Sequence, residues 1–165
     1  MTIGDLNLMD RNDFVAVVGW IFEHSPWVAE RAWAARPFAG LHALHTAMVE
    51  QVERATKAEQ LALLQAHPDL GTRARLSPAS TGEQAGAGLD SLTPDEFAQL
   101  HRLNSEYRGR FGFPFLLAVK GSTKHDVLRA LHVRMEACPE DEFREALRQV
   151  YRIAKFRLED TVTES

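Results

Sequence analysis

The sequence has little of what disulfide-bonded, membrane-spanning or nucleic-acid-binding proteins require. Its single cysteine, Cys138, cannot form a disulfide within the chain, which fits a reducing compartment. No apolar run reaches the roughly 20 residues that a bilayer-crossing helix needs, and the acidic N-terminus lacks the layout of a secretory signal. The net charge of −4 gives no basic excess for binding phosphate backbones. These absences predict a cytoplasmic protein that binds neither membrane nor nucleic acid.

Patterns typical of metal sites, activated nucleophiles and phosphate loops are also missing. The sequence contains no HExxH, CxxC, GxSxG or SxxK, and no glycine-rich phosphate loop. His42 and His45 are three residues apart, a spacing that suits metal ligands, but no third ligand can be named. The alternative is that both are surface or half-buried residues of one helix. The absent patterns favour this alternative, so we expect no metal site.

What the sequence does contain is a regular helical pattern of apolar residues. The 165 residues are 45% hydrophobic and 25% charged, as in an ordinary globular domain with a sizeable core. One set of apolar side chains falls on a single helical face, at Phe14, Val17, Val18, Ile21 and Phe22. Similar spacing recurs along most of the chain, without internal repeats or linkers. We therefore predict an all-α fold, a compact multi-helix bundle forming one domain over residues 1–165.

Capping residues predict where the helices begin. Thr56 with Glu59, and Thr93 with Glu96, have the spacing of capping boxes. The predicted starts lie at Asp10, Ser25, Gly40, Thr56, Thr93, Ser122 or Thr123, and Pro139.

Two stretches do not fit the helical pattern. Residues 70–88, LGTRARLSPASTGEQAGAG, are rich in Gly, Pro, Ser and Thr and should be largely loop. Residues 109–121, GRFGFPFLLAVKG, are apolar and interrupted by Pro114, which disfavours a helical conformation at Phe113. No partner strand is evident. We therefore expect a buried extended segment near 111–119.

The stretch HPDLG, residues 67–71, follows a run of good helix formers. Pro68 lacks a backbone donor and disfavours a helical His67, so the helix should end near Ala66. A histidine that leaves a helix in this way can point into a cleft, and imidazole exchanges protons near neutral pH. Alternatively, His67 only caps the helix C-terminus. The residues alone leave both readings open.

Ser80 and Glu83 are spaced as in a capping box for a short helix over residues 82–88. The neighbouring Gln84 adds a neutral donor and acceptor. The free N–H groups at a helix N-terminus also suit an anion. The same residues could therefore cap a helix, line a pocket for a small anionic substrate, or do both.

Three of these stretches, taken in order, are similar to one enzyme family. HPDLG, STGEQAGAGLD and LNSEYRGRFGFPFLLAVKG resemble the decarboxylases of urate degradation that act on 2-oxo-4-hydroxy-4-carboxy-5-ureidoimidazoline, or OHCU. The resemblance extends to RMEACPEDEFREAL and to the closing IAKFRLED, and so covers most of the chain. Several motifs in order are far more specific than any one of them.

The resemblance implies a compact all-helical enzyme, commonly a homodimer, that needs neither metal nor organic cofactor. It implies loss of carbon dioxide from an anionic ureidoimidazoline to give (S)-allantoin. Carried over residue by residue, it places the catalytic histidine at His67 and a catalytic, substrate-contacting carboxylate at Glu83. The other substrate-binding positions that it implies are Pro68, Ser80, Gln84, Phe115, Leu116, Leu117, Ala118, Val119 and Arg157.

Two other classes of function remain open at this point. A non-catalytic helical binding module would keep the pocket but would not use His67 as an acid or base. An interaction scaffold would use Trp20, Trp27 and Trp33 as a partner surface, although three tryptophans so close together belong more often to a core. Production of allantoin from OHCU separates the enzyme from both.

Overall fold

The computed structural model describes residues 1–71 and 77–164, and all the regular secondary structure in these ranges is helical. Within these ranges there is no β-strand, and the only ladder pairing is an isolated bridge between Thr2 and Thr163. The predicted all-α class is therefore confirmed. No helix of the described ranges is both long and apolar enough to cross a bilayer.

The helices follow one another with short connections. They are α1 (Ile3–Leu8), α2 (Arg11–Val18), α3 (Trp27–Ala32), the 3-10 turn η1 (Trp33–Ala35), α4 (Leu41–Arg54), α5 (Lys57–Gln65), α6 (Pro78–Gly86), α7 (Pro94–Phe111), α8 (Lys124–Met135) and α9 (Pro139–Thr161). Contacts divide the chain into two compact units, residues 1–66 with 151–165, and residues 67–150. The prediction of one domain over residues 1–165 stays a prediction.

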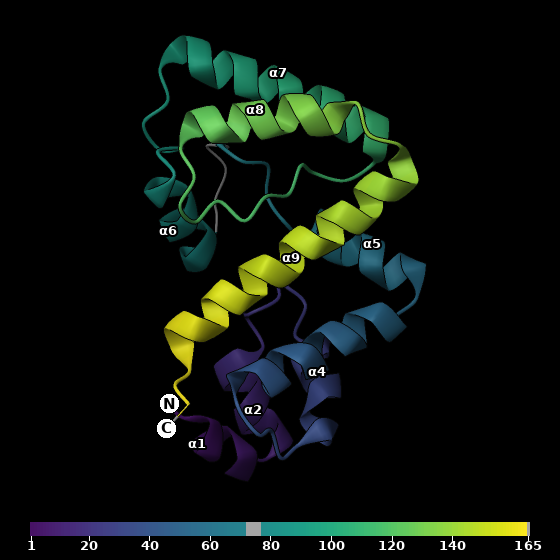
Figure 1. Cartoon of the computed structure of the whole chain (residues 1–165), viewed down its shortest axis with the longest axis vertical. Coiled ribbons are helices and arrows are strands. Elements are labelled where there is room, and N and C mark those ends of the chain that lie inside the picture. The colour runs from purple at the N-terminus through teal and green to yellow at the C-terminus, as the bar shows by residue number, and fades with distance from the viewer. Residues whose placement is uncertain (72–76, 165) are drawn as a thin grey trace. The chain divides into compact units, whose positions relative to one another are not determined.

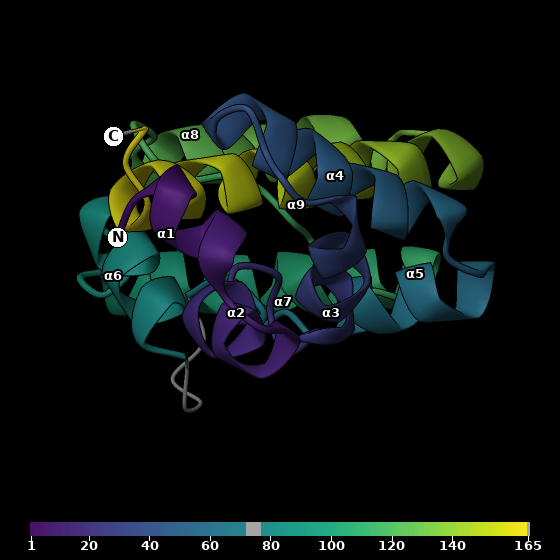
Figure 2. The ribbon, with the colours of Figure 1, turned by 90° about the horizontal axis from the view of Figure 1, so that it is seen from below.

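The first unit contains α1 to α5 and the last turns of α9. Helix α3 packs against α2 and α4 (Figure 2). The two chain ends lie side by side (Figure 1), because Thr163 donates its N–H to the Met1 carbonyl at 2.9 Å and accepts from the Ile3 N–H at 3.0 Å. The largest buried side chains of this unit include Leu6, Phe14, Ile21, Phe22, Leu44, Met48, Leu63 and Leu64.

The second unit contains α6, α7, α8 and the first turns of α9. Helices α7 and α8 run alongside each other (Figure 1), joined by an ion pair of 2.8 Å between Lys124 and Glu96. An aromatic cluster connects α7 with the segment that follows it and with α9, with ring centroids 4.5 to 6.2 Å apart. Its members are Tyr107, Phe111, Phe113, Phe115 and Phe143.

Most of the predicted helix starts are confirmed. Thr56, Thr93 and Thr123 each form a complete capping box, with their hydroxyls accepting from backbone N–H groups three residues on. Asp10 and Gly40 are N-caps as expected, and the last helix begins at Pro139. The prediction of Ser25 is wrong by one residue, since Pro26 is the N-cap of α3.

The three tryptophans do not belong to the buried core. Trp20 is exposed, and Trp27 and Trp33 are half-buried. The guanidinium of Arg31 lies 4.5 Å from the ring centre of Trp27, and that of Arg36 lies 4.0 Å from Trp33. Stacked arginines therefore cover two of the aromatic faces that a partner surface would offer.

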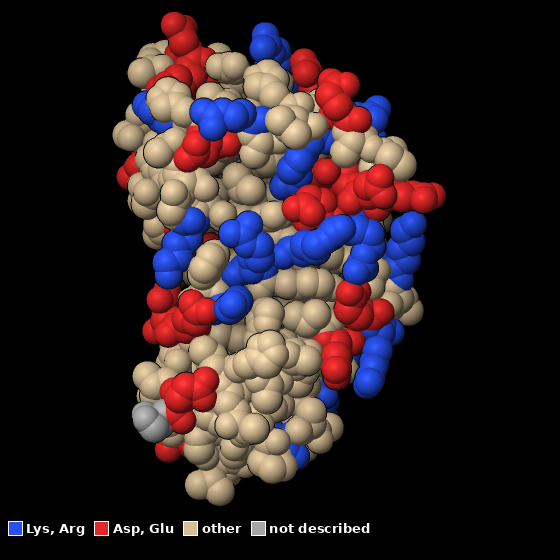
Figure 3. Space-filling model, viewed as in Figure 1, with Lys and Arg blue, Asp and Glu red and all other residues tan. Residues whose placement is uncertain are grey.

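Although the net charge is negative, exposed basic residues form a strip along α9. Acidic and basic groups are interspersed over the face shown in Figure 3, and Lys and Arg side chains gather across its middle. On α9 the exposed basic residues follow helical spacing along one side of the helix. They are Arg144, Arg148, Arg152 and Lys155.

Candidate active site

His67 lies directly after α5 and is almost fully buried. The helix ends at Gln65 with Ala66 as its C-cap, one residue before the histidine. This is the end that we predicted from Pro68. The exposed fraction of His67 is only 6%, and Pro68 is half-buried. A histidine in this position is shielded from bulk water, which suits a group that transfers a proton to a bound molecule.

Side chains from α7 fix the segment that follows His67. Arg108 pairs with Asp69 at 3.0 Å, and the amide nitrogen of Asn104 donates to the Leu70 carbonyl at 2.9 Å. Asn104 is 4% exposed, and its amide oxygen is buried without a hydrogen-bond partner among the described residues. These two contacts determine the path of the backbone next to the candidate catalytic histidine.

Gly71 ends the segment in a conformation that requires glycine. Its φ is +72°, and a Cβ at this position would lie 2.4 Å from a methyl carbon of Leu100. The Gly71 N–H donates to Oε1 of Gln84 on α6 at 2.9 Å. The segment 67–71 and helix α6 are thereby joined by one buried hydrogen bond.

Helix α6 begins earlier than the sequence predicted. Ser77 is the N-cap and Pro78 occupies the first turn, so the expectation of loop across residues 78–86 is wrong. The predicted capping box of Ser80 and Glu83 is wrong as well, because the hydroxyl of Ser77 accepts from the Ser80 N–H at 3.2 Å. Glu83 therefore lies in the helix interior and has no capping role.

The three candidate residues of α6 share one side of the helix. Ser80 and Gln84 are four residues apart and both buried, each 6% exposed, whereas Glu83 beside them is half-buried. Since Oε1 of Gln84 already accepts from Gly71, its amide nitrogen is the group with hydrogens to donate. The predicted loop residues 72–76 lie outside the described residues.

The predicted buried segment near 111–119 is confirmed from Phe113 onward. Helix α7 runs to Phe111 and closes with Gly112 in the left-handed region, at φ +83°. Residues 113–119 then have neither helix nor strand, and all except Leu117 are buried. An apolar segment without a partner strand must satisfy its backbone groups in another way.

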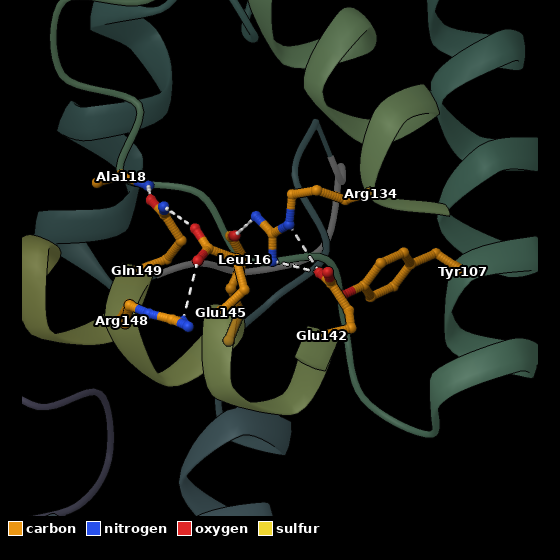
Figure 4. Close-up of polar contacts among 8 residues, drawn as sticks. All are labelled: Tyr107, Leu116, Ala118, Arg134, Glu142, Glu145, Arg148 and Gln149. Atoms are coloured by element: carbon orange, nitrogen blue, oxygen red, sulfur yellow. Dashed lines mark hydrogen bonds and ion pairs between the residues drawn. The ribbon is translucent and has the colours of Figure 1, made fainter. Parts of the chain in front are cut away.

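Side chains of α8 and α9 satisfy part of that backbone (Figure 4). Arg134 donates to the Leu116 carbonyl, and the Ala118 N–H donates to Oε1 of Gln149 at 3.0 Å. Arg134 also pairs with Glu142 at 2.5 Å, and Glu142 accepts a hydrogen bond of 2.5 Å from the Tyr107 hydroxyl. Burial, and then the hydrogen bond to Glu142, raise the pKa of Tyr107 far above its usual value. The phenol therefore remains a donor.

Arg157 lies in the first unit and is engaged there by an acid that the sequence reasoning missed. One of its amino groups is 2.8 Å from Oε2 of Glu23, and another donates to the Ile21 carbonyl at 3.3 Å. The two charged side chains are 5% and 2% exposed. Nothing in the spacing of the sequence connects these residues, which come from opposite ends of the chain.

The histidines do not form a metal cluster. Among the described residues no group of three or more His, Cys, Asp or Glu side chains could hold an ion. His42 is exposed, and Nε2 of His45 lies 2.8 Å from the Tyr151 carbonyl. Burial lowers the pKa of His45, so the neutral ring donates this hydrogen bond.

Comparison with known proteins gives one consistent answer. Residues 7–159 match the sequence model of a family described as OHCU decarboxylase. The chain is 46% identical to 2-oxo-4-hydroxy-4-carboxy-5-ureidoimidazoline decarboxylase of Haloferax volcanii, over 96% of this chain and 94% of that protein. It is 48% identical to the uric acid degradation bifunctional protein PucL of Bacillus subtilis, over 99% of this chain but only 33% of that protein.

A solved structure agrees with the sequence comparisons. The crystal structure of an (S)-allantoin synthase superposes with a TM-score of 0.79 at 36% identity, covering 98% of this chain and 54% of that one. The chain thus spans nearly the whole of the Haloferax relative, about half of the synthase and a third of the bifunctional protein.

Proposed function

Because the chain belongs to the OHCU decarboxylase family, we propose that it removes carbon dioxide from OHCU to give (S)-allantoin, as a step of urate degradation. The observation that carries the proposal is the near-full-length similarity to a relative named for this activity. The buried His67, at the start of the segment tied to α6 and α7, supplies a group of the chemistry that the reaction needs.

The reaction needs orientation and controlled proton transfer. When the bond to the carboxylate breaks, its electron pair forms a C=C bond to the neighbouring ring carbon, and the pair of the adjacent C=N bond moves onto the ring nitrogen, which takes up a proton. The hydroxyl group of the resulting enol then loses its proton to become a carbonyl while the neighbouring carbon gains one, so that one proton is taken up overall. The enzyme must hold the carboxylate out of the ring plane and control the protonation of that carbon.

His67 is proposed to bind the 4-hydroxyl and manage the proton. Glu83 is proposed to accept from ring or ureido N–H groups, as a carboxylate does well. The amide nitrogen of Gln84 suits a substrate carbonyl, because its oxygen is already committed to Gly71. Ser80 and the backbone at Pro68 complete this part of the proposed set.

Two further parts of the proposed set bind the rest of the substrate. Backbone groups of residues 115–119 would present donors and acceptors to the urea-like edges of the ring. Arg157 is proposed to interact with the carboxylate that leaves. Tight binding of the carboxylate would oppose its loss as carbon dioxide. The ion pair with Glu23 compensates part of the charge of Arg157 and so weakens its binding of the substrate carboxylate. We also propose a cytoplasmic homodimer without metal or organic cofactor.

The direct test is to mix the purified protein with freshly generated OHCU in the presence of a metal chelator. Circular dichroism should show rapid accumulation of (S)-allantoin, against slow racemic product without enzyme. Protein that leaves the spontaneous rate and racemic outcome unchanged would be a binding module or scaffold instead. Activity that disappears on chelation and returns with a divalent ion would contradict the metal-free part alone.

A further inference from the structure

Two side chains outside the proposed contact set hold the backbone of residues 115–119. Arg134 on α8 donates to the Leu116 carbonyl, and Gln149 on α9 accepts from the Ala118 N–H at 3.0 Å (Figure 4). The two residues lie on consecutive helices, and both contact the backbone of this segment. The resemblance to the decarboxylases assigns a role to neither of them.

Arg134 is itself held in one orientation. Its Nε donates to Oε1 of Glu142 at 2.7 Å, and its guanidinium carbon lies 4.5 Å from the ring centre of Phe115. Glu142 is 1% exposed and also accepts from Tyr107. Only a planar guanidinium can stack on a ring and donate to both a carboxylate and a carbonyl. The position of the Leu116 carbonyl is therefore coupled to a buried charged network.

Gln149 fixes the second point of the segment. Its Oε1 accepts from Ala118, and its Nε2 donates to Oε1 of Glu145 at 2.9 Å. The carboxylate of Glu145 can only accept, so it determines which end of the Gln149 amide faces the segment. Gln149 is 6% exposed, and water therefore competes little for these bonds.

The two anchored groups lie on one edge of the segment, where the Leu116 carbonyl and the Ala118 N–H meet the side chains of Arg134 and Gln149. In an extended chain the backbone groups of alternate residues point to the same side. An extended segment anchored in this way would turn the backbone groups of Phe115 and Leu117 to the opposite edge. Leu117 is also the one member of residues 113–119 that is not fully buried. The opposite edge is where a planar ligand would meet the segment.

We propose that Arg134 and Gln149 are positioning residues, which hold residues 115–119 in the register that binds the substrate ring. The inference rests on the proposed decarboxylase function, so wild-type turnover is measured first. The first variant, Arg134→Lys, keeps the positive charge facing Glu142 but loses the several N–H donors of the planar guanidinium. The second, Gln149→Met, keeps the size of the side chain but loses both hydrogen bonds. The control is Arg129→Lys, on the same helix α8, at an arginine that is 74% exposed.

Measuring kcat and KM separately distinguishes a positioning role from an effect on stability alone. A variant that only lowers the folded fraction reduces apparent kcat and leaves KM at the wild-type value. A displaced binding edge weakens the substrate complex, and misplacement of about 1 Å can cost about 100-fold. We expect KM to rise about 10-fold or more in Arg134→Lys and Gln149→Met, and to remain unchanged in Arg129→Lys.

A partner exchange provides the rescue. In the double variant Gln149→Glu with Glu145→Gln, the carboxylate still accepts from the Ala118 N–H and the new amide at 145 donates to it. We expect this variant to recover most of the KM lost in Gln149→Met. Amide hydrogen exchange of a peptide covering residues 116–119 should follow the same order: slow in wild type, fast in Gln149→Met, and slow again in the exchange variant.

The outcomes distinguish the two proposals. Wild-type KM in both folded single variants, with wild-type exchange at residues 116–119, would overturn the positioning role. Absence of wild-type turnover would overturn the function instead, while hydrogen exchange would still show whether the two side chains hold the segment. Equal KM values in Gln149→Met and in the exchange variant would remove Gln149 from the proposal.

Discussion

The buried ion pair of Glu23 and Arg157 makes the most demanding prediction about stability. Glu23→Gln removes a carboxylate that lies 2.8 Å from the guanidinium and is 2% exposed. Arg157 is 5% exposed, so the cation would be left in a region where water cannot replace the lost partner. The substitution barely changes size, so packing is not the cause of the effect.

The expected cost is large for a single, nearly isosteric change. Removing one partner of a buried pair costs about 3–5 kcal/mol of unfolding free energy. At about 2–4 °C per kcal/mol for a chain of this size, the melting temperature should fall by about 6–20 °C. The same acid-to-amide change at Glu106, in an exposed pair with Arg102, should cost about 1 kcal/mol or less.

The measurement is thermal and urea unfolding of wild type, Glu23→Gln and Glu106→Gln under one set of conditions. A second variant, Glu23→Gln with Arg157→Met, removes the buried cation as well. It should be no less stable than Glu23→Gln alone, because the cation rather than the missing carboxylate carries the penalty. Glu23→Gln melting within 2 °C of Glu106→Gln, or additive losses in the double variant, would refute this reasoning.

The other predictions concern the candidate site and one surface carboxylate. His67→Asn should fold normally and lose about 10²–10⁴-fold in kcat if His67 manages the proton; wild-type turnover in the folded variant would remove that role. Glu83→Gln should lower kcat/KM strongly and should cause no loss of helix capping, since Ser77 is the cap; a lower melting temperature with normal kinetics would contradict the substrate contact. The hydrogen bond from Lys124, with those from Thr93, lowers the pKa of Glu96 from 4.5 to about 2. Because this carboxylate binds its proton more weakly when folded, its contribution is present above pH 4.5 and lost as the pH falls toward 2. Melting curves of wild type and Glu96→Gln should therefore differ at pH 7 and converge by pH 2, and a constant difference would contradict the pKa shift.

The parts of the fold that the sequence predicted depend on local chemistry. Thr56, Thr93 and Thr123 each accept from a backbone group three residues away, so both partners are visible in one short window. The end of α5 depends only on Pro68. The burial of residues 113–119 follows from an apolar run that proline keeps out of a helix.

The error in the predicted start of α6 also comes from residues that lie close together in the sequence. Two serines, Ser77 and Ser80, each precede a suitable helix, and the S-x-x-E spacing favoured the second. Ser77 followed by Pro78 was the better signal, because proline suits the first helical position and its missing N–H costs nothing there. The difference matters for function, since it moves Glu83 from a capping position into the interior of the helix.

The groups that hold the candidate site could not be found in this way. Arg134 and Leu116 are 18 residues apart, Gln149 and Ala118 are 31 apart, and Glu23 and Arg157 come from opposite ends of the chain. A residue that contacts a substrate must have the right chemical type, so His67 and Glu83 are candidates from the sequence, and the family resemblance then assigns the proposed roles to them. A residue that holds a backbone carbonyl needs only to donate from the right place, and many side chains can do that. Its role therefore becomes apparent only once the packing of α8 and α9 against residues 115–119 is known.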